Sequence, residues 1–421
     1  MKHIFKTPID NNYFFGYYDK SPLNIDNKKL LACRVDFIDR MPTKYDTLEI
    51  GYFDWKDSNE FIKLSDTKAW NWQQGCMLQW LAPPSYDSKI IYNDRRNGKF
   101  ISVILNIETK VEDILPMSFY TLSSDGKFAL CIDNERHYWH RKGYNYQGVE
   151  NLDKKKGIDE NDGIWYMDMV TKELSQIINM KKLLDHKPLS NMRDAIHYVE
   201  HLMISPNSKR FCFLHRWRLD DGGIYARFYT LNVDGSDLYL VNDSGRMSHT
   251  CWRGDSQLLA FCGLETPVNK LRKYKSIIKY FIKPLLPTYH KLITDNSPSM
   301  RNRLIGDSYV LFNDKTSKKI RLAQNILSED GHPSFRPGNV DEFITDTYPN
   351  QKSIATLLLF SISNNKTIMI DSLNSIKGFD NTGYRCDLHP KWSFDGGYIS
   401  IDTMNDKVRG IYLYEITRKI K

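Results

Sequence analysis

Four of the eleven histidines in this 421-residue chain occupy the same place in a recurring pattern. Each opens a short apolar stretch that runs into a turn rich in Ser, Pro, Asp, Asn or Gly, and a second apolar stretch follows. These residues are His201, His249, His332 and His389. Imidazoles that gather at one point act as metal ligands or as acid–base groups. Chance would rarely place four histidines at one structural position. The alternative to a functional site is that each imidazole forms a hydrogen bond with a backbone group between repeats.

The same pattern occurs three more times, with other residues in the first position. The copies open at Tyr17, Met77, Phe119 and then at the four histidines. A third apolar stretch follows most copies, which predicts seven sheets of about four strands each, an all-β seven-bladed β-propeller. The last copy ends after its third strand. We therefore predict that His3–Lys6 supplies the missing outer strand and closes the ring, so that residues 1–421 form one domain.

The predicted fold places the histidines relative to one another. In a propeller the first strand of each blade lines the central channel, and the start of that strand lies beside the end of the second strand. The four imidazoles are therefore expected to surround one mouth of the channel. The same reasoning brings His215 and Arg216, and also Arg95 and Arg96, to this mouth because they end second strands.

Two insertions interrupt the repeats. Residues 134–162 contain Arg141, Tyr144 and Tyr146, and we expect this loop to overhang the face that carries the histidines. Its alternative is a solvated loop with aromatic anchors. Residues 265–306 read as a basic amphipathic helix broken by proline, which fits a membrane surface or a protein partner. The alternative is a helix packed on the rim of the propeller.

Composition narrows the class of protein. The net charge of +8 is spread over 59 basic and 51 acidic residues, which argues against nucleic acid as a partner. The seven cysteines are odd in number and lack CxxC spacing, as is typical of a reducing compartment. No signal peptide and no run of ~20 apolar residues is visible, so we expect a cytoplasmic monomer, membrane-associated if the 265–306 insertion binds lipid. No phosphate-binding glycine motif supports a nucleotide site.

Several segments resemble a known family. The segments HLMISPNSKRFCFLHRW, GHPSFRPGNVDEFITDTYP and RCDLHPKWSFDGGYISIDT are similar to the seven-bladed propeller polysaccharide lyases, with the oligogalacturonate and ulvan lyases as the nearest types. The resemblance implies a histidine or tyrosine base, an arginine facing a uronate carboxylate, and a divalent metal (Mn, Zn or Ca) held by histidines. By motif, His201 and Arg216 match the base and the arginine. The metal set would be His249, His332 and His389. A glutamine ligand has no clear counterpart, because Gln74 and Gln79 fall in another repeat.

The corresponding reaction is β-elimination at a uronic acid in an acidic oligo- or polysaccharide. His201 or His215 would remove the proton α to the carboxylate, and Arg216 or a cation would stabilise the resulting negative charge. Tyr144 or Tyr146 would protonate the leaving oxygen. Further substrate contacts are expected from Tyr17, Tyr18, Trp72, Arg95, Arg96, Arg141 and Arg385.

Two other functions remain open. One is a non-catalytic propeller in cytoplasmic polysaccharide assembly, which binds a glycan or a partner through residues 265–306. The other is a glycoside hydrolase on the same face. Its paired acids would come from Asp19, Asp94, Asp346 and Asp402. The distance between two of these carboxylates would decide whether they can act as such a pair.

Overall fold

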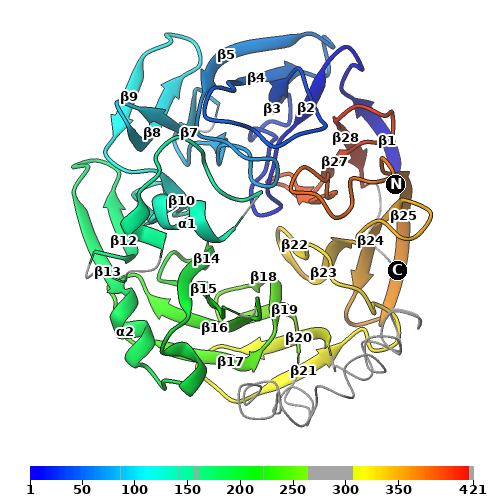
Figure 1. Cartoon of the computed structure of the whole chain (residues 1–421). Helices are drawn as coiled ribbons and strands as arrows, with labels where there is room; N and C mark the ends of the chain where they lie inside the picture. Colours follow the sequence, from blue (N-terminus) through cyan, green and yellow to red (C-terminus); the bar gives the residue numbers. More distant parts are fainter. Residues whose placement is uncertain are drawn as a thin grey trace.

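Seven sheets surround a central channel in the computed structural model, which describes residues 1–85, 87–141, 143–155, 158, 161–220, 222–263 and 307–416. Each sheet has four antiparallel strands and forms one blade of a ring, as Figure 1 shows. Little helix is present among these residues. The all-β seven-bladed propeller predicted from the repeats is confirmed.

The strands of a blade follow one another outward from the channel. Blade 1 consists of β2 (Asn12–Phe14), β3 (Lys29–Val35), β4 (Leu48–Asp54) and β5 (Phe61–Thr67). Blade 2 consists of β6 (Gln79–Trp80), β7 (Lys89–Arg96), β8 (Lys99–Asn106) and β9 (Glu112–Leu115). Blade 3 consists of β10 (Phe119–Leu122), β11 (Phe128–Ile132), β12 (Gly163–Asp168) and β13 (Leu174–Asn179). Blade 4 consists of β14 (Ile196–Ile204), β15 (Arg210–Arg218), β16 (Ile224–Asn232) and β17 (Tyr239–Gly245). Blade 5 consists of β18 (Met247–Arg253), β19 (Gln257–Gly263), β20 (Asp307–Asn313) and β21 (Lys319–Leu322). Blade 6 consists of β22 (Ser334–Arg336), β23 (Asn339–Asp346), β24 (Ile354–Ser361) and β25 (Lys366–Asn374).

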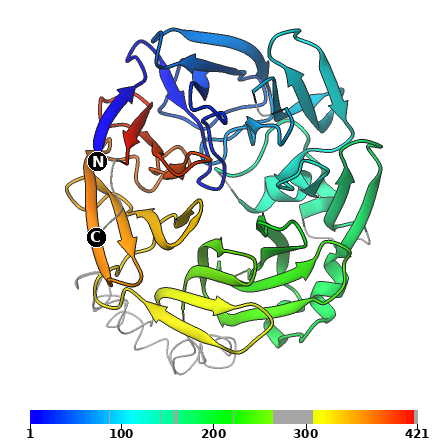
Figure 2. The same cartoon turned by 180° about the vertical axis from the view of Figure 1, so that it is seen from behind.

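Blade 7 closes the ring with strands from both ends of the chain. It contains β26 (Lys391–Trp392), β27 (Tyr398–Thr403), β28 (Gly410–Glu415) and, as its outer strand, β1 (Lys2–Lys6). The register of this last pair runs from Lys2 opposite Glu415 to Lys6 opposite Tyr412. Figure 2 shows β1 beside the last blade from behind. The predicted closure by the N-terminal strand is therefore confirmed, and β28 has no free edge.

Burial of the second strands explains why they read as continuous apolar runs in the sequence. All of β11 is buried, and so is all of β15 except its last residue. A neighbouring blade packs on each face of such a strand, so neither face alternates with solvent. All seven cysteines are buried free thiols.

The first repeat begins earlier than the sequence pattern indicates. Its inner strand β2 ends at Phe14, and Tyr17 lies in the segment that follows this strand. The helical elements are short: α1 (Asn134–His140), α2 (Met180–Asp185) and the 3₁₀ turns η1 (Leu152–Lys155) and η2 (Ser190–Met192). The 265–306 insertion lies outside the described residues. None of the described helices is long and apolar enough to cross a membrane.

Phe5 makes the ring closure testable. Its side chain is 7% exposed, and its ring lies 5.9 Å from Phe53 and 6.0 Å from Trp55 of blade 1, measured between centroids. Phe5→Ala is expected to lower the free energy of unfolding by about 3 kcal/mol, because a buried ring is lost. Urea unfolding measures this change. Lys2→Ala, on an exposed position of the same strand, should stay within about 0.5 kcal/mol. Equal stability of the two variants would show that closure contributes little.

Candidate functional site

Two of the predicted histidines have an unusual backbone conformation. His201 and His389 have φ values of 55° and 43°, in the left-handed region that residues other than glycine seldom adopt. The pairing of β14 slips between Glu200 and Met203, and the pairing of β18 slips around His249. Such bulges re-aim a side chain out of the regular pleat. The first positions of these repeats are therefore set by local backbone conformation as well as by the blade.

The four imidazoles form a continuous chain of contacts. The ring centroids of His201 and His249 are 5.8 Å apart, those of His249 and His332 are 4.0 Å apart, and those of His332 and His389 are 4.3 Å apart. Each of the four residues is at most 3% exposed. Blades 4 to 7 thus bring one histidine each to a common point.

Tyr17 and Tyr18 of blade 1 reach across the channel to this chain of imidazoles. The Tyr17 hydroxyl is hydrogen-bonded to Nδ1 of His201. The Tyr18 hydroxyl donates to the carbonyl oxygen of Thr250 at 2.7 Å and accepts from its backbone N–H at 3.1 Å. Both tyrosines are 2% exposed. Tyr17 therefore belongs to the histidine cluster, whereas the hydroxyl of Tyr18 is occupied by the backbone of blade 5.

A buried ion pair in blade 7 holds the segment that carries these tyrosines. The Asp402 carboxylate accepts from the backbone N–H groups of Phe15 at 2.9 Å and Gly16 at 3.0 Å, and from Lys391 Nζ at 3.1 Å. Gly16 has a φ of +121°, and a Cβ there would lie 2.8 Å from the backbone carbon of Gln74. Only glycine fits this crossing.

Three residues form a group able to hold a metal ion: His332, Asp387 and His389. Their ligand atoms all lie within 4.8 Å of one another, and all three residues are buried. Nε2 of His332 and Nε2 of His389 have no hydrogen-bond partner among the described residues. Burial lowers the pKa of both imidazoles well below the usual value, so both are neutral at pH 7. Two neutral imidazoles and a carboxylate are a donor set that suits divalent Mn or Zn.

His249, the third predicted ligand, sits beside this group. Its Nδ1 lies 3.2 Å from Oδ1 of Asp330 and 3.3 Å from the Ser248 hydroxyl. Cys386 precedes Asp387, and burial raises the pKa of its thiol to about 12, so no thiolate forms there at neutral pH. Asp387 was not among the predicted ligands. Its position two residues before His389 was the available signal.

A buried carboxylate organises the arginines of the mouth. Glu200 lies next to His201 and forms ion pairs with Arg141 at 3.2 Å and with Arg216, while His201 Nε2 lies 3.4 Å away. Burial would raise the pKa of Glu200, but Arg141 and Arg216 outweigh it and hold the pKa well below its usual range. Two guanidinium groups on one carboxylate leave a net positive charge. The sequence prediction missed Glu200 although it adjoins a predicted residue.

Two further residues bring positive charge and a hydroxyl to the mouth. Tyr144 of the 134–162 insertion has its ring centroid 6.3 Å from that of His201 and 4.3 Å from the guanidinium carbon of Arg141. Arg385 pairs with Asp387 at 2.9 Å and lies over the ring of Tyr348 at 5.6 Å. The side chains of Arg141 and Arg385 are 26% and 23% exposed, so both remain accessible.

Five predicted site residues have their contacts elsewhere. His215 is fully buried and bonds His197 at 3.0 Å, Tyr146 accepts from Asn93 at 3.0 Å, and Trp72 donates to the Arg40 carbonyl at 2.8 Å. Arg96 pairs with Asp94 and Glu112, both at 2.7 Å. Arg95 donates to the backbone carbonyls of Gln147 and Lys44. These residues join blades and loops, and the structure does not bring them to the imidazoles.

The four carboxylates considered for hydrolysis each have a partner side chain. The pairs are Asp19 with Lys20 at 2.7 Å, Asp94 with Arg96 at 2.7 Å, Asp346 with His332 at 2.9 Å, and Asp402 with Lys391 at 3.1 Å. Burial raises the pKa of Asp346 to about 7. A pair of carboxylates facing an open site is not among these arrangements.

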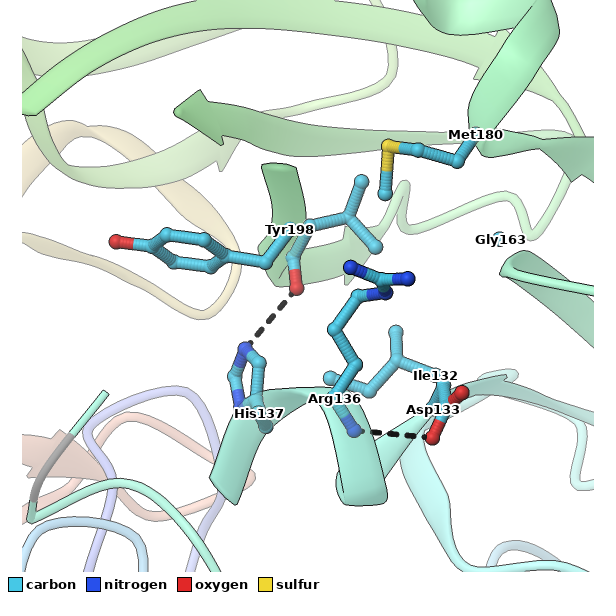
Figure 3. A pocket seen from close by; sticks show the side chains of 8 residues that line it. Ile132, Asp133, Arg136, His137, Gly163, Met180 and Tyr198 are labelled. Atoms are coloured by element: carbon cyan, nitrogen blue, oxygen red, sulfur yellow. Dashed lines mark hydrogen bonds between the residues drawn. The ribbon is translucent and has the colours of Figure 1, made fainter. Parts of the chain in front are cut away.

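The helix α1 anchors the insertion that carries Arg141 and Tyr144. Asp133 caps α1 by accepting from the backbone N–H groups of Glu135 at 2.9 Å and Arg136 at 3.2 Å. His137 Nε2 donates to the carbonyl of Val199 in β14 at 3.1 Å, and Arg136 pairs with Asp162. Figure 3 shows Asp133, Arg136 and His137 among the residues that line a small cavity. The volume of this cavity is about 10 Å³, roughly the room that one water needs.

The buried histidines near α1 predict acid sensitivity. Burial lowers the pKa of His140 to about 3 and that of His197 to about 4. The unfolded chain binds these protons near pH 6.5 and the folded chain does not, so stability is full above about pH 6.5 and falls as the pH drops. Each residue contributes a slope of up to about 1.4 kcal/mol per pH unit, down to its folded pKa. Urea unfolding at pH 8, 6 and 5 measures this slope, and His140→Gln should reduce it. A flat profile would contradict the prediction.

Solved structures of other proteins have the same fold. No family model and no curated protein matches the sequence. Among solved structures, an oligogalacturonate lyase in complex with manganese has a TM-score of 0.62 at 14% identity, over 98% of this chain and 92% of that one. The oligogalacturonate lyase of Vibrio parahaemolyticus gives 0.59 at 12%, over 99% and 93%. The propeller domain of the Trilobed protease of Pyrococcus furiosus gives 0.50 at 10%, over 96% and 97%. At these identities the likeness shows the propeller fold, which lyases and proteases share.

Proposed function

We propose that this protein is a polysaccharide lyase-like enzyme that cleaves a uronic-acid-containing glycan by β-elimination at the channel mouth, with a bound divalent metal. The observation that carries the proposal is the group of His332, Asp387 and His389 beside accessible arginines. The similarity in fold to an oligogalacturonate lyase in complex with manganese agrees with it.

The metal would be held by His332, Asp387 and His389. The fit rests on two buried Nε2 atoms that lack hydrogen-bond partners among the described residues and on a carboxylate within reach of both. When bound, a divalent cation supplies positive charge that stabilises the negative charge developing on the uronate carboxylate. All other steps are assigned to side chains of the chain itself.

The arginines account for an acidic substrate. Arg141 and Arg385 are partly exposed cations of the site, and Arg141 shares Glu200 with Arg216. The positive charge left over on this pair suits a carboxylate, which a guanidinium group binds through two parallel hydrogen bonds. A neutral sugar would leave this charge unused.

Tyr17 and His201 supply the proton acceptor. Burial lowers the pKa of His201 to about 4 and raises that of Tyr17 well above its usual value, so both are neutral at pH 7. As the Tyr17 oxygen takes the proton α to the uronate carboxylate, its own proton passes to Nδ1 of His201. The imidazolium that forms lies 3.4 Å from the Glu200 carboxylate, which stabilises it.

Tyr144 completes the elimination. The electron pair of the broken C–H bond forms the double bond to the β-carbon, and the bond from that carbon to the glycosidic oxygen breaks. Tyr144 donates its proton to the leaving oxygen. Burial raises the pKa of Tyr144, which keeps the hydroxyl protonated at neutral pH.

The test is to mix the purified protein and Mn²⁺ with a panel of uronate-containing polysaccharides and follow the absorbance of the unsaturated product. Arg141→Gln should reduce the rate on an active substrate at least about 100-fold, because a charged contact in the site is lost. Arg253→Gln is the matched control. Arg253 ends β18, away from His249 near its start, and donates to the Val340 carbonyl of β23. No increase in absorbance across a broad panel would reject the lyase function.

A further inference from the structure

Asp346 connects the two histidines of the candidate metal group. It ends β23 in blade 6 and is 2% exposed. Its carboxylate accepts from the backbone N–H of His332 at 2.7 Å, from His332 Nδ1 at 2.9 Å and from the backbone N–H of His389 at 3.2 Å. One buried carboxylate therefore contacts both residues, His332 through its backbone N–H and Nδ1 and His389 through its backbone N–H.

The contact with Nδ1 determines the protonation of His332. An ionised carboxylate only accepts hydrogen bonds, so Nδ1 carries the proton whenever Asp346 is ionised. In a neutral imidazole the other nitrogen, Nε2, then keeps its lone pair. This nitrogen is buried and has no hydrogen-bond partner in the part of the chain that the structure describes. The arrangement matches the outer carboxylates that commonly orient metal-binding histidines.

The contact with His389 acts through the backbone. The φ of His389 is 43°, a conformation that a residue other than glycine keeps only when surrounding contacts hold it. The hydrogen bond from its N–H to Asp346 is one such contact, and it crosses from blade 7 to blade 6. The position of the His389 ring therefore depends on a side chain of the neighbouring blade.

We infer that Asp346 is a positioning residue of the metal site: it holds His332 in the Nδ1-protonated form and fixes the backbone of His389, so that both Nε2 atoms face the ion. The inference rests on the metal site of the proposed function. It assigns Asp346 no contact with the metal or the substrate.

Nitrogen NMR of the metal-free protein with ¹⁵N-labelled histidine tests the first part. Long-range ¹H–¹⁵N spectra at pH 8 distinguish the two neutral forms of each imidazole, and His332→Gln identifies the signals of His332. We expect the Nδ1-protonated form in the wild-type protein. In Asp346→Asn the amide NH₂ group competes as a donor, and we expect a shift toward the Nε2-protonated form. A wild-type His332 protonated on Nε2 would overturn the inference.

Calorimetric titration with Mn²⁺ tests the second part. Asp346→Asn should weaken Mn²⁺ binding about 10–100-fold, the usual cost of losing an outer partner. Asp341→Asn is the matched control, because Asp341 lies near the other end of β23 and accepts from Ser361 and Ser363. Its Kd should equal that of the wild-type protein.

The outcomes separate this inference from the proposed function. A Kd of Asp346→Asn within twofold of wild type would overturn the positioning role, and so would a wild-type protein that binds no Mn²⁺. If Mn²⁺ binds and Asp346→Asn weakens binding while no polysaccharide is cleaved, the positioning role stands and the lyase function fails.

Discussion

His389→Ala is expected to weaken Mn²⁺ binding at least about 100-fold, more than the loss of an outer partner, and to remove lyase activity with it. His389 contributes one of the two unpaired Nε2 atoms of the group, and alanine has no donor to replace it. Titration calorimetry measures the affinity, and circular dichroism shows whether the sheets persist.

The matched control for this change is His186→Ala. His186 is a half-buried histidine that follows α2 and approaches the Tyr229 hydroxyl at 3.4 Å. Its replacement should leave the Kd for Mn²⁺ unchanged. If His389→Ala also binds Mn²⁺ with wild-type affinity, the group of His332, Asp387 and His389 is not the metal site.

Asp402→Ala is expected to lower the free energy of unfolding by about 3–5 kcal/mol. Lys391, which is 1% exposed, would keep a buried charge without its carboxylate, and the N–H groups of Phe15 and Gly16 would lose their acceptor. The pKa of Lys391 is already lowered by burial, and Asp402 opposes that effect. Urea unfolding at pH 7.5 measures the change.

A double variant separates the lost charge pair from the lost backbone contacts. Lys391→Met together with Asp402→Leu removes both charges, so it should recover part of the stability that Asp402→Ala loses. The remainder measures the anchoring of Phe15 and Gly16. A loss below about 1 kcal/mol in Asp402→Ala would mean that the pair does not hold the tyrosine segment in place.

The fold was predictable because every blade repeats one pattern, so seven weak signals support one another. Register within a blade was harder, as β15 shows. His215 and Arg216 are neighbours, but successive side chains of a strand point to opposite faces. His215 packs with Trp217 at 5.5 Å between centroids, whereas Arg216 reaches Glu200. The sequence pattern identified the end of the strand but not which of its two faces meets the channel.

The contacts between residues of the site could not be predicted, for a different reason. Asp346 contacts His389 over 43 residues of chain, and Tyr17 contacts His201 over 184. Such partners meet only when neighbouring or opposite blades are in place, and no local spacing encodes them. Trp72, predicted to contact the substrate, illustrates the reverse case, since large aromatic residues are more often core than substrate platforms. Tyr146, predicted as a proton donor, is likewise buried.

The anchoring of Gly16 by Asp402 has a consequence for the biosynthesis of the protein. The two residues are 386 positions apart, so the segment that carries Tyr17 is made early and its anchor emerges near the end of translation. A chain that ends before blade 7 can form the earlier blades, but it lacks the Asp402 carboxylate that holds the segment of Tyr17 near His201. The proposed lyase activity is therefore expected only after the last blade is synthesised, and a chain that lacks this blade is expected to be inactive.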